Sequence, residues 1–150
     1  MTTVRHANSS DVDRVYELIV AIADHHDQTQ HVRTNPTELL AAGFGDDPSF
    51  GVLLAEHDGA VVGYVSYTIN YSIWLGRQYM NIDDVYVDAH CRGRGIGEAL
   101  MQGAKDHCDK QSISRIRWEV QTDNRDAIRF YERLGAKYRE KGVFTWDFSR

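Results

Sequence analysis

The stretch 82–103 constrains this chain most, because it reads as a strand, a glycine-rich loop and a helix in direct succession. Its strand part is short and rich in β-branched and aromatic residues, so it can be buried on both faces. The loop has the pattern Arg92-x-x-Gly95-x-Gly97, and glycine lets a backbone turn sharply and approach a ligand closely. A helix that follows such a loop presents free N–H groups and its positive dipole end to an anion. Because Arg92 and Arg94 add positive charge there, the loop is predicted to bind a di- or polyphosphate.

The phosphate ligand is not that of the two commonest glycine-rich loops. No Gly-Lys-Ser/Thr follows, as a P-loop requires, and the three-glycine dinucleotide pattern after a first strand is missing. An ordinary glycine-rich turn with two solvated arginines remains the alternative at this point.

A second stretch, 123–136, has the pattern of a capped amphipathic helix. Asp123 or Asn124 can cap its start. Four apolar residues recur on one face at helical spacing, and Gly135 follows where a helix would stop. The apolar face consists of Ala127, Ile128, Tyr131 and Leu134.

Together the two stretches resemble the Gcn5-related N-acetyltransferases. The resemblance rests on Arg-x-x-Gly-x-Gly after a mid-chain strand, then a strand at 116–120, then Asn-x-x-Ala-Ile-x-Phe-Tyr-x-x-Leu-Gly-Ala. Three further segments are similar to the diamine and thialysine N-acetyltransferases within that superfamily. They are Gly-Phe-Gly-x-x-Pro at 43–48, Tyr-x-x-Trp-x-Gly-Arg at 71–77, and the acidic strand Ile-Asp-Asp-Val-Tyr-Val at 82–87.

The element pattern predicts an α/β (α+β) fold with a mixed, mostly antiparallel sheet of about seven strands and helices on both faces. The predicted strands are 3–7, 51–57, 61–71, 79–88, 115–120, 136–140 and 143–148. The predicted helices run from Ser9 or Ser10 as the cap to about 25, from 35 to about 43, from the glycine loop onward, and over 124–134. The helix after the loop should bury Ile96, Leu100, Ala104 and Cys108. The resemblance implies that the fourth and fifth strands are parallel and splay apart around acetyl-CoA.

Composition fits one domain over residues 1–150 and excludes several classes. The net charge of −5 argues against a nucleic-acid partner, and no apolar run is long enough to span a membrane. The start of the chain has no signal-peptide pattern, which predicts a cytoplasmic location. The two cysteines form no Cys-x-x-Cys pair, and no metal site is expected.

The resemblance implies acetyl transfer from acetyl-CoA to a primary amine of a small molecule, by direct attack in a ternary complex. Asp83 is the predicted proton acceptor, because it occupies the position of a family glutamate. Asp84 would point to the opposite face of a regular strand, so one of the pair could bind the cationic amine. A solvated acidic strand end is the simpler interpretation of both. Tyr131 is the predicted general acid, although an aromatic residue on an apolar helix face is usually core packing.

The predicted cofactor contacts follow the two motifs. Val85, Tyr86 and Val87 should contact acetyl-CoA, Val85 and Val87 by pairing with the pantetheine arm, and a backbone N–H near Val85 should hold the oxyanion. Asn124 and Tyr131 should also contact the cofactor, Asn124 in addition to or instead of capping its helix. The pyrophosphate should lie on Arg92, Gly93, Arg94, Gly95, Ile96 and Gly97.

The acceptor contacts are predicted from departures within the family. Ser72 is the residue type of the thialysine members, where diamine-specific members have an acid, so spermidine fits poorly and a small amine or amino-acid side chain fits better. His25 and His26 occupy positions that line the polyamine channel, and Trp74 should line the acceptor pocket or a subunit interface. The resemblance favours a homodimer. A protein N-terminus or lysine, an aminoglycoside, or a non-catalytic acetyl-CoA-binding role are the alternatives.

Overall fold

The computed structural model describes residues 1–149, which form two compact units, 1–118 and 119 onward. Each unit is described by itself, and the expectation of one domain over the whole chain stays a prediction. The strands are β1 (Thr2–His6), β2 (Gly51–His57), β3 (Ala60–Ser72), β4 (Arg77–Val87) and β5 (Ile116–Trp118). The helices are α1 (Val12–His25), α2 (Pro36–Gly43), α3 (Ile96–Lys110) and, in the second unit, α4 (Arg125–Arg133). Short 3-10 turns occupy 9–11, 29–31 and 89–91.

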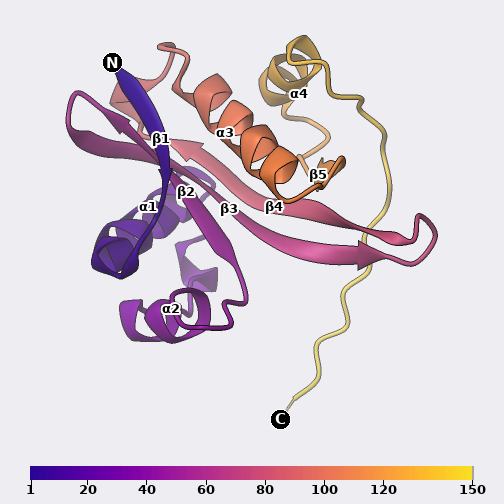
Figure 1. The fold of residues 1–150 in the computed structure, drawn as a ribbon, viewed down its shortest axis with the longest axis horizontal. Coiled ribbons are helices and arrows are strands. Elements are labelled where there is room, and N and C mark those ends of the chain that lie inside the picture. Colours follow the sequence, from indigo (N-terminus) through magenta and orange to yellow (C-terminus); the bar gives the residue numbers. More distant parts are fainter. Residues whose placement is uncertain (150) are drawn as a thin grey trace. The chain divides into compact units, whose positions relative to one another are not determined.

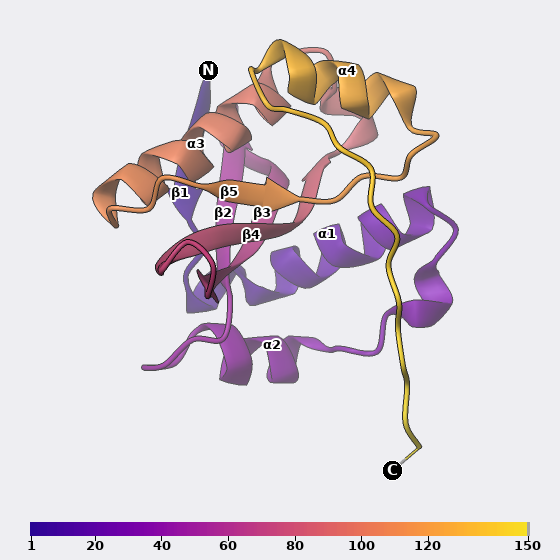
Figure 2. The same ribbon diagram turned by 90° about the vertical axis from the view of Figure 1, so that its right-hand side faces the viewer.

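The first unit is a mixed sheet covered on both faces. The strand order is β1-β2-β3-β4-β5, with antiparallel pairing throughout except for the parallel pair β4 and β5 (Figure 1). Helices α1 and α2 lie on one face of the sheet and α3 lies on the other (Figure 2). The predicted fold class and the parallel fourth and fifth strands are therefore confirmed.

The helix starts follow local capping chemistry. Helix α1 is entered through a capping box in which the Asn8 side chain accepts from the Ser10 N–H and Asp11 accepts from the Asn8 N–H. The predicted cap at Ser9 or Ser10 was one or two residues too late, because Asn8 offers an equally good acceptor just before the turn. Asn35 caps α2 by accepting from the Glu38 N–H, with Pro36 in the first turn as expected.

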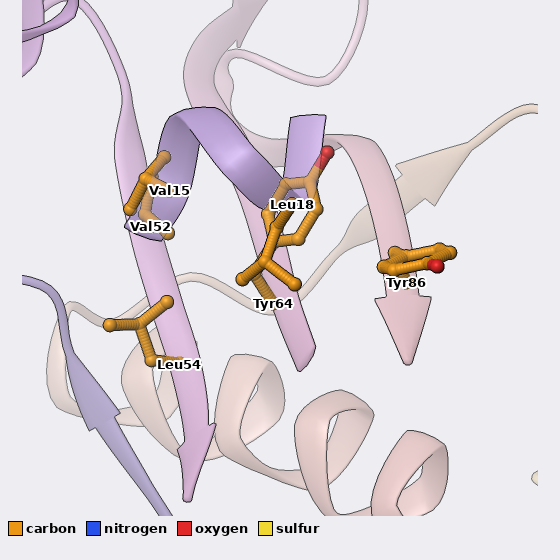
Figure 3. Packing of buried hydrophobic residues seen from close by; sticks show 6 residues of the cluster. All are labelled: Val15, Leu18, Val52, Leu54, Tyr64 and Tyr86. Atoms are coloured by element: carbon orange, nitrogen blue, oxygen red, sulfur yellow. The ribbon is translucent and has the colours of Figure 1, made fainter. Parts of the chain in front are cut away.

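The core on the α1 face is built from alternate residues of the strands. Val15 and Leu18 of α1 pack against Val52 and Leu54 of β2, with the rings of Tyr64 and Tyr86 closing the cluster (Figure 3). Leu53 and Ala55 lie between these positions in β2 and are buried as well. A strand buried on both faces is a near-continuous apolar run, and β2 has that composition.

The predicted strands 136–140 and 143–148 are wrong, so the sheet has five strands where about seven were expected. Residues 136–149 belong to no helix or strand, and Phe144, Trp146 and Phe148 are exposed. The alternating apolar pattern of this segment is a local signal, whereas a strand exists only when a neighbour supplies the backbone hydrogen bonds. An isolated hairpin is at best marginally stable in water.

Candidate active site

The glycine-rich loop connects the end of β4 to the start of α3. Gly93 and Gly95 have φ of +78° and +77°, the left-handed region that favours glycine, and Gly95 is the N-cap residue of α3. Ile96 is buried and anchors the first turn, while the loop on its other side is exposed. No side chain of the described residues caps this helix start, and uncapped N–H groups at a helix start can bind an anion.

Arg92 is held in place at this loop by two contacts. Its Nε donates to the carbonyl oxygen of Val87 at 3.0 Å, and its guanidinium lies 5.5 Å from the centre of the Tyr86 ring. A guanidinium over an aromatic face is stabilised by the ring quadrupole. The structure therefore brings together Tyr86, Val87 and Arg92, which the sequence assigned to one ligand. Gly93, Arg94, Gly95, Ile96 and Gly97 complete the same loop and helix start.

The parallel pairing of β4 with β5 is short. It covers Met80–Ile82 against Ile116–Trp118, and no strand of the described residues pairs with the following part of that edge, 83–87. Backbone groups along 83–87, including those of Val85 and Val87, can accept an extended ligand as an added strand. The splay predicted for these two strands therefore has a defined starting point.

Strand β4 carries a bulge at Asp83. Ser66 of β3 lies opposite Asp84 and the next residue, Tyr67, lies opposite Ile82, which leaves Asp83 as the extra residue. In a regular strand neighbouring side chains point to opposite faces, and a bulge removes that alternation locally. Asp83 and Asp84 accordingly both line one cavity, on the α1 face. We expected Asp84 to point away from Asp83 if the strand were regular. The strand is bulged at Asp83, so this expectation is wrong here.

The two carboxylates differ in their surroundings. The hydroxyl of Tyr64, a fully buried residue, donates to Oδ2 of Asp84 at 3.1 Å, and Asn81 Nδ2 donates to Oδ1 of Asp83 at 3.1 Å. Burial raises the pKa of Asp84, while the Tyr64 hydrogen bond and the charge of His26 oppose the rise. Burial and then the Asp84 charge raise the pKa of Asp83, although its side chain is the more exposed one.

Two cavities meet at Asp84. One, of about 350 Å³, contains the acid pair. It is lined by Val15, Ile19, Leu39, Ser49, Phe50, Val52, Tyr64, Ser66, Thr68, Asp83 and Asp84. The other, of about 380 Å³, is lined by Ile19, Ile22, Ala23, His26, Gln28, His31, Val32 and Asp84. Because Ile19 and Asp84 line both cavities, the two cavities are neighbouring compartments.

The remaining predicted acceptor residues lie elsewhere. His25, at the end of α1, has its ring 5.1 Å from that of His26 but lines neither cavity. Trp74 is 98% exposed in the turn between β3 and β4 and also lines neither, so its interface role stays a prediction. Sequence reasoning missed Tyr64 and His31. The pocket position of Tyr64 could have been found from its even spacing to Ser66, but nothing local identifies His31.

The second unit contains the other predicted catalytic residue. Asn124 caps α4, its side chain accepting from the Ala127 N–H at 3.3 Å. Tyr131 lies in the same helix, partly buried, and burial raises the pKa of its phenol. The capping role assigned to Asn124 as an alternative is thus present, and the cofactor roles of both residues stay predictions.

Two further searches of the described residues bear on ligands. No group of three or more His, Cys, Asp or Glu side chains among residues 1–149 is arranged to hold a metal ion. None of the helices in that range has both the length and the apolar character to cross a membrane.

An open strand edge, a glycine-rich helix start without a side-chain cap and an acid-lined cavity on one five-stranded mixed sheet are the parts that acyl transfer from a phosphate-bearing thioester requires. The sequence model of the acetyltransferase (GNAT) family matches residues 12–136, and the chain belongs to that family. It is an acetyltransferase, and the family uses acetyl-CoA.

Individual relatives agree. A thialysine N-epsilon-acetyltransferase of Mus musculus is 31% identical over 144 residues, covering 91% of this chain and 84% of that protein. An aminoalkylphosphonate N-acetyltransferase of Salmonella typhimurium is 29% identical over 138 residues, which cover 89% of this chain and 84% of that protein. A solved aminoglycoside acetyltransferase from a soil metagenome superposes with a TM-score of 0.82 at 15% identity, over 99% of this chain and 97% of that one. At that identity the last comparison shows the fold alone.

Proposed function

We propose that this acetyltransferase moves the acetyl group of acetyl-CoA to a primary amine of a small aliphatic molecule, of the thialysine, short diamine or amino-acid type. The observation that carries the proposal is the bulge at Asp83, because it directs the carboxylates of Asp83 and Asp84 toward the same cavity. A carboxylate pair with apolar walls is suited to an alkylammonium group. The names of the relatives, which act on thialysine and aminoalkylphosphonate, support an amine of this size.

The acid pair can remove the proton that prevents the amine from attacking. An alkyl amine has a pKa of about 10.4, so near neutral pH it arrives protonated and cannot attack a thioester. Asp84, the more buried acid, binds the ammonium group. Asp83 accepts its proton, directly or through water, because its exposed side chain can pass the proton on to solvent. The raised pKa of each carboxyl makes it a stronger base than an ordinary aspartate.

Acetyl-CoA supplies the thioester, and the chain positions it. In this proposal the loop 92–97 binds the pyrophosphate, the edge 83–87 pairs with the pantetheine arm, and an N–H near Val85 receives the negative charge that develops on the thioester oxygen. The amine nitrogen bonds to the carbonyl carbon and the carbon–sulfur bond breaks. Tyr131 gives its phenolic proton to the departing thiolate, consistent with a raised pKa that keeps the phenol protonated.

The proposal includes a homodimer. Ile73 and Trp74, with exposed fractions of 85% and 98%, lie in the turn between β3 and β4 between the exposed Tyr71 and Leu75, and a run of exposed apolar side chains is typical of an interaction surface. Light scattering of the purified protein measures the mass directly, and a monomer at all concentrations would remove this part of the proposal.

The test is release of free CoA from acetyl-CoA, followed with a thiol reagent across thialysine, lysine, spermidine, putrescine, an aminoglycoside and a short peptide. We expect turnover with the small amines. Asp83→Asn should lower kcat by about a hundredfold, the usual contribution of a general base. Asp109→Asn, a matched change at an exposed position of α3, should behave as wild type.

Tyr131→Phe tests the second role. We expect kcat to fall by about a hundredfold with KM for the amine little changed, because the phenol acts on the leaving group. Turnover only with the peptide, or wild-type rates in both Asp83→Asn and Tyr131→Phe, would contradict the proposed function or its residue roles.

A further inference from the structure

The compartment beside the acid pair differs from it in chemistry. Its walls along α1 and at 32 are apolar, formed by Ile22, Ala23 and Val32. Its polar lining, apart from the shared Asp84, consists of three side chains that can donate hydrogen bonds, namely His26, Gln28 and His31. Asp84 is the only acid among the residues that line it.

These donors come from one short part of the chain. His26 follows the last turn of α1, Gln28 comes two residues later, and His31 ends the 3-10 turn 29–31. The described residues supply none of these three side chains with a hydrogen-bond partner, and all three are exposed to solvent. They are therefore available to a ligand that enters the compartment.

The charge pattern selects between acceptor types. A diamine bound by Asp83 and Asp84 at one end would place its second ammonium among imidazole and amide groups, where the one lining acid, Asp84, already binds the first amine. An aliphatic amine with an acidic group at the far end would place that group against two imidazoles and an amide, while its methylenes contact the apolar walls. Hydrogen bonds from such donors to an anion are about twice as strong as those between neutral groups.

We propose that the compartment lined by His26, Gln28 and His31 recognises an acidic group, a carboxylate or phosphonate, at the end of the acceptor opposite the amine that is acetylated. The inference rests on the proposed function and narrows it: the acceptor is an amino acid or aminoalkyl acid, and His26 and His31 determine that specificity. Both histidines act on binding and not on the chemical step.

Lysine and cadaverine provide a matched pair, because cadaverine is lysine without its carboxylate. We expect the wild-type enzyme to favour lysine in kcat/KM by about tenfold or more, the contribution of one hydrogen bond to a charged group. 5-Aminopentylphosphonate has a phosphonate in place of the second ammonium of cadaverine and lacks the α-amino group of lysine, so it is compared with cadaverine. A kcat/KM above that of cadaverine agrees with the inference, and one below it contradicts recognition of a phosphonate.

Variants then locate the preference. His26→Gln and His31→Gln should each raise KM for lysine more than KM for cadaverine, and in the double variant the ratio of kcat/KM for lysine to that for cadaverine should fall to about one. His31→Glu should reverse the preference. Lys105→Gln removes a positive charge from an exposed position of α3, on the other face of the sheet, and should leave the ratio unaltered.

The outcomes separate the two levels of the argument. Equal rates on lysine and cadaverine, or faster acetylation of cadaverine, would overturn the acidic-group inference and leave the proposed acetyltransferase intact. A lysine preference that survives in the double variant would overturn the assignment to this compartment. Failure to acetylate any of the three amines, with acetyl-CoA bound, would refute the proposed small-amine acetylation and the inference with it.

Discussion

Removing the Tyr64 hydroxyl should change both stability and the pH dependence of the enzyme. Tyr64 is fully buried, and its hydroxyl donates to Asp84 at 3.1 Å. Burial and the Asp84 charge raise the pKa of the phenol, so it remains a donor at any working pH. Tyr64→Phe keeps the ring in the core beside Leu18 and removes the donor alone (Figure 3).

The magnitude follows from the charge of the acceptor. A hydrogen bond to an ionised group contributes about 1.5–3 kcal/mol, and water in the open cavity can replace part of it, so we expect a loss of about 1–2 kcal/mol at pH 7.5. When Asp84 is protonated, the lost bond is between neutral groups and contributes only about 0.5–1 kcal/mol. The stability difference between wild type and Tyr64→Phe should therefore grow as the pH rises.

The linkage between the pKa of Asp84 and the free energy of unfolding gives the same direction of pH dependence. Burial holds the pKa of Asp84 above its unfolded value, so the folded state keeps a proton that the unfolded state has already lost. This contribution to stability is complete below the unfolded pKa, about 3.9, and is lost as the pH rises through the folded pKa. Tyr64→Phe raises the folded pKa further, because the hydrogen bond that opposed the rise is gone.

Two assays measure this effect. Urea unfolding at pH 4.5 and pH 7.5 gives the stability difference, with Tyr71→Phe as a control because the Tyr71 side chain is exposed. The acid limb of kcat/KM against pH reports the ionisation of the acid pair in the free enzyme and should move to higher pH in Tyr64→Phe. Equal losses of stability at both pH values, together with an unmoved acid limb, would refute the argument that this hydroxyl supports an ionised Asp84.

Three further outcomes are expected. Gly95→Ala and Gly59→Ala both put a side chain at positive φ, +77° and +84°, so each should lose about 1–2 kcal/mol in urea unfolding. Calorimetry should find weaker acetyl-CoA binding in Gly95→Ala alone, and equal binding in both would contradict the loop assignment. In Gly63→Ala the new Cβ would lie 2.6 Å from a backbone carbonyl oxygen of β4, so we expect a loss of about 3 kcal/mol; a loss below 1 kcal/mol would show that β4 yields easily. Burial lowers the pKa of His6 and of His107, so stability should increase as the pH rises toward about 6.5, and His107→Gln should flatten that increase. An unchanged slope in the unfolding data would exclude His107 as a contributor.

The parts of the fold that the sequence predicted are those that local chemistry determines. The dipeptide Asp58-Gly59 between the predicted strands 51–57 and 61–71 is typical of a tight hairpin turn, and both residues adopt positive φ. The buried positions of α3 follow the helical period, and Ile96, Leu100 and Cys108 are all buried as expected. The strand predictions within 136–149 were wrong because a strand requires a pairing partner, and no local signal in this segment identifies one.

The cavities could be predicted only in part. Asp83 and Asp84 were identified from their position in the fourth strand, but a regular strand separates them. Whether a strand is bulged depends on the register of its neighbour, here Ser66 and Tyr67, some sixteen residues away in the chain. Position in the strand therefore predicted the residues, and only the sheet shows that they face one cavity.

The bulge lies where the two halves of the proposed site adjoin. Parallel pairing between β4 and β5 ends at Ile82, the residue just before the extra residue Asp83. The bulge belongs to the β3–β4 ladder and re-aims side chains, while the open part of the opposite edge begins at the same residue. On the α1 face the bulge gathers the carboxylates that would bind the amine, and the backbone from 83 to 87 that would hold the thioester lies along the edge that β5 leaves unpaired. A nucleophile and its target must be within a few ångströms to react, and a single extra residue in β4 puts their two binding surfaces at consecutive positions of one strand.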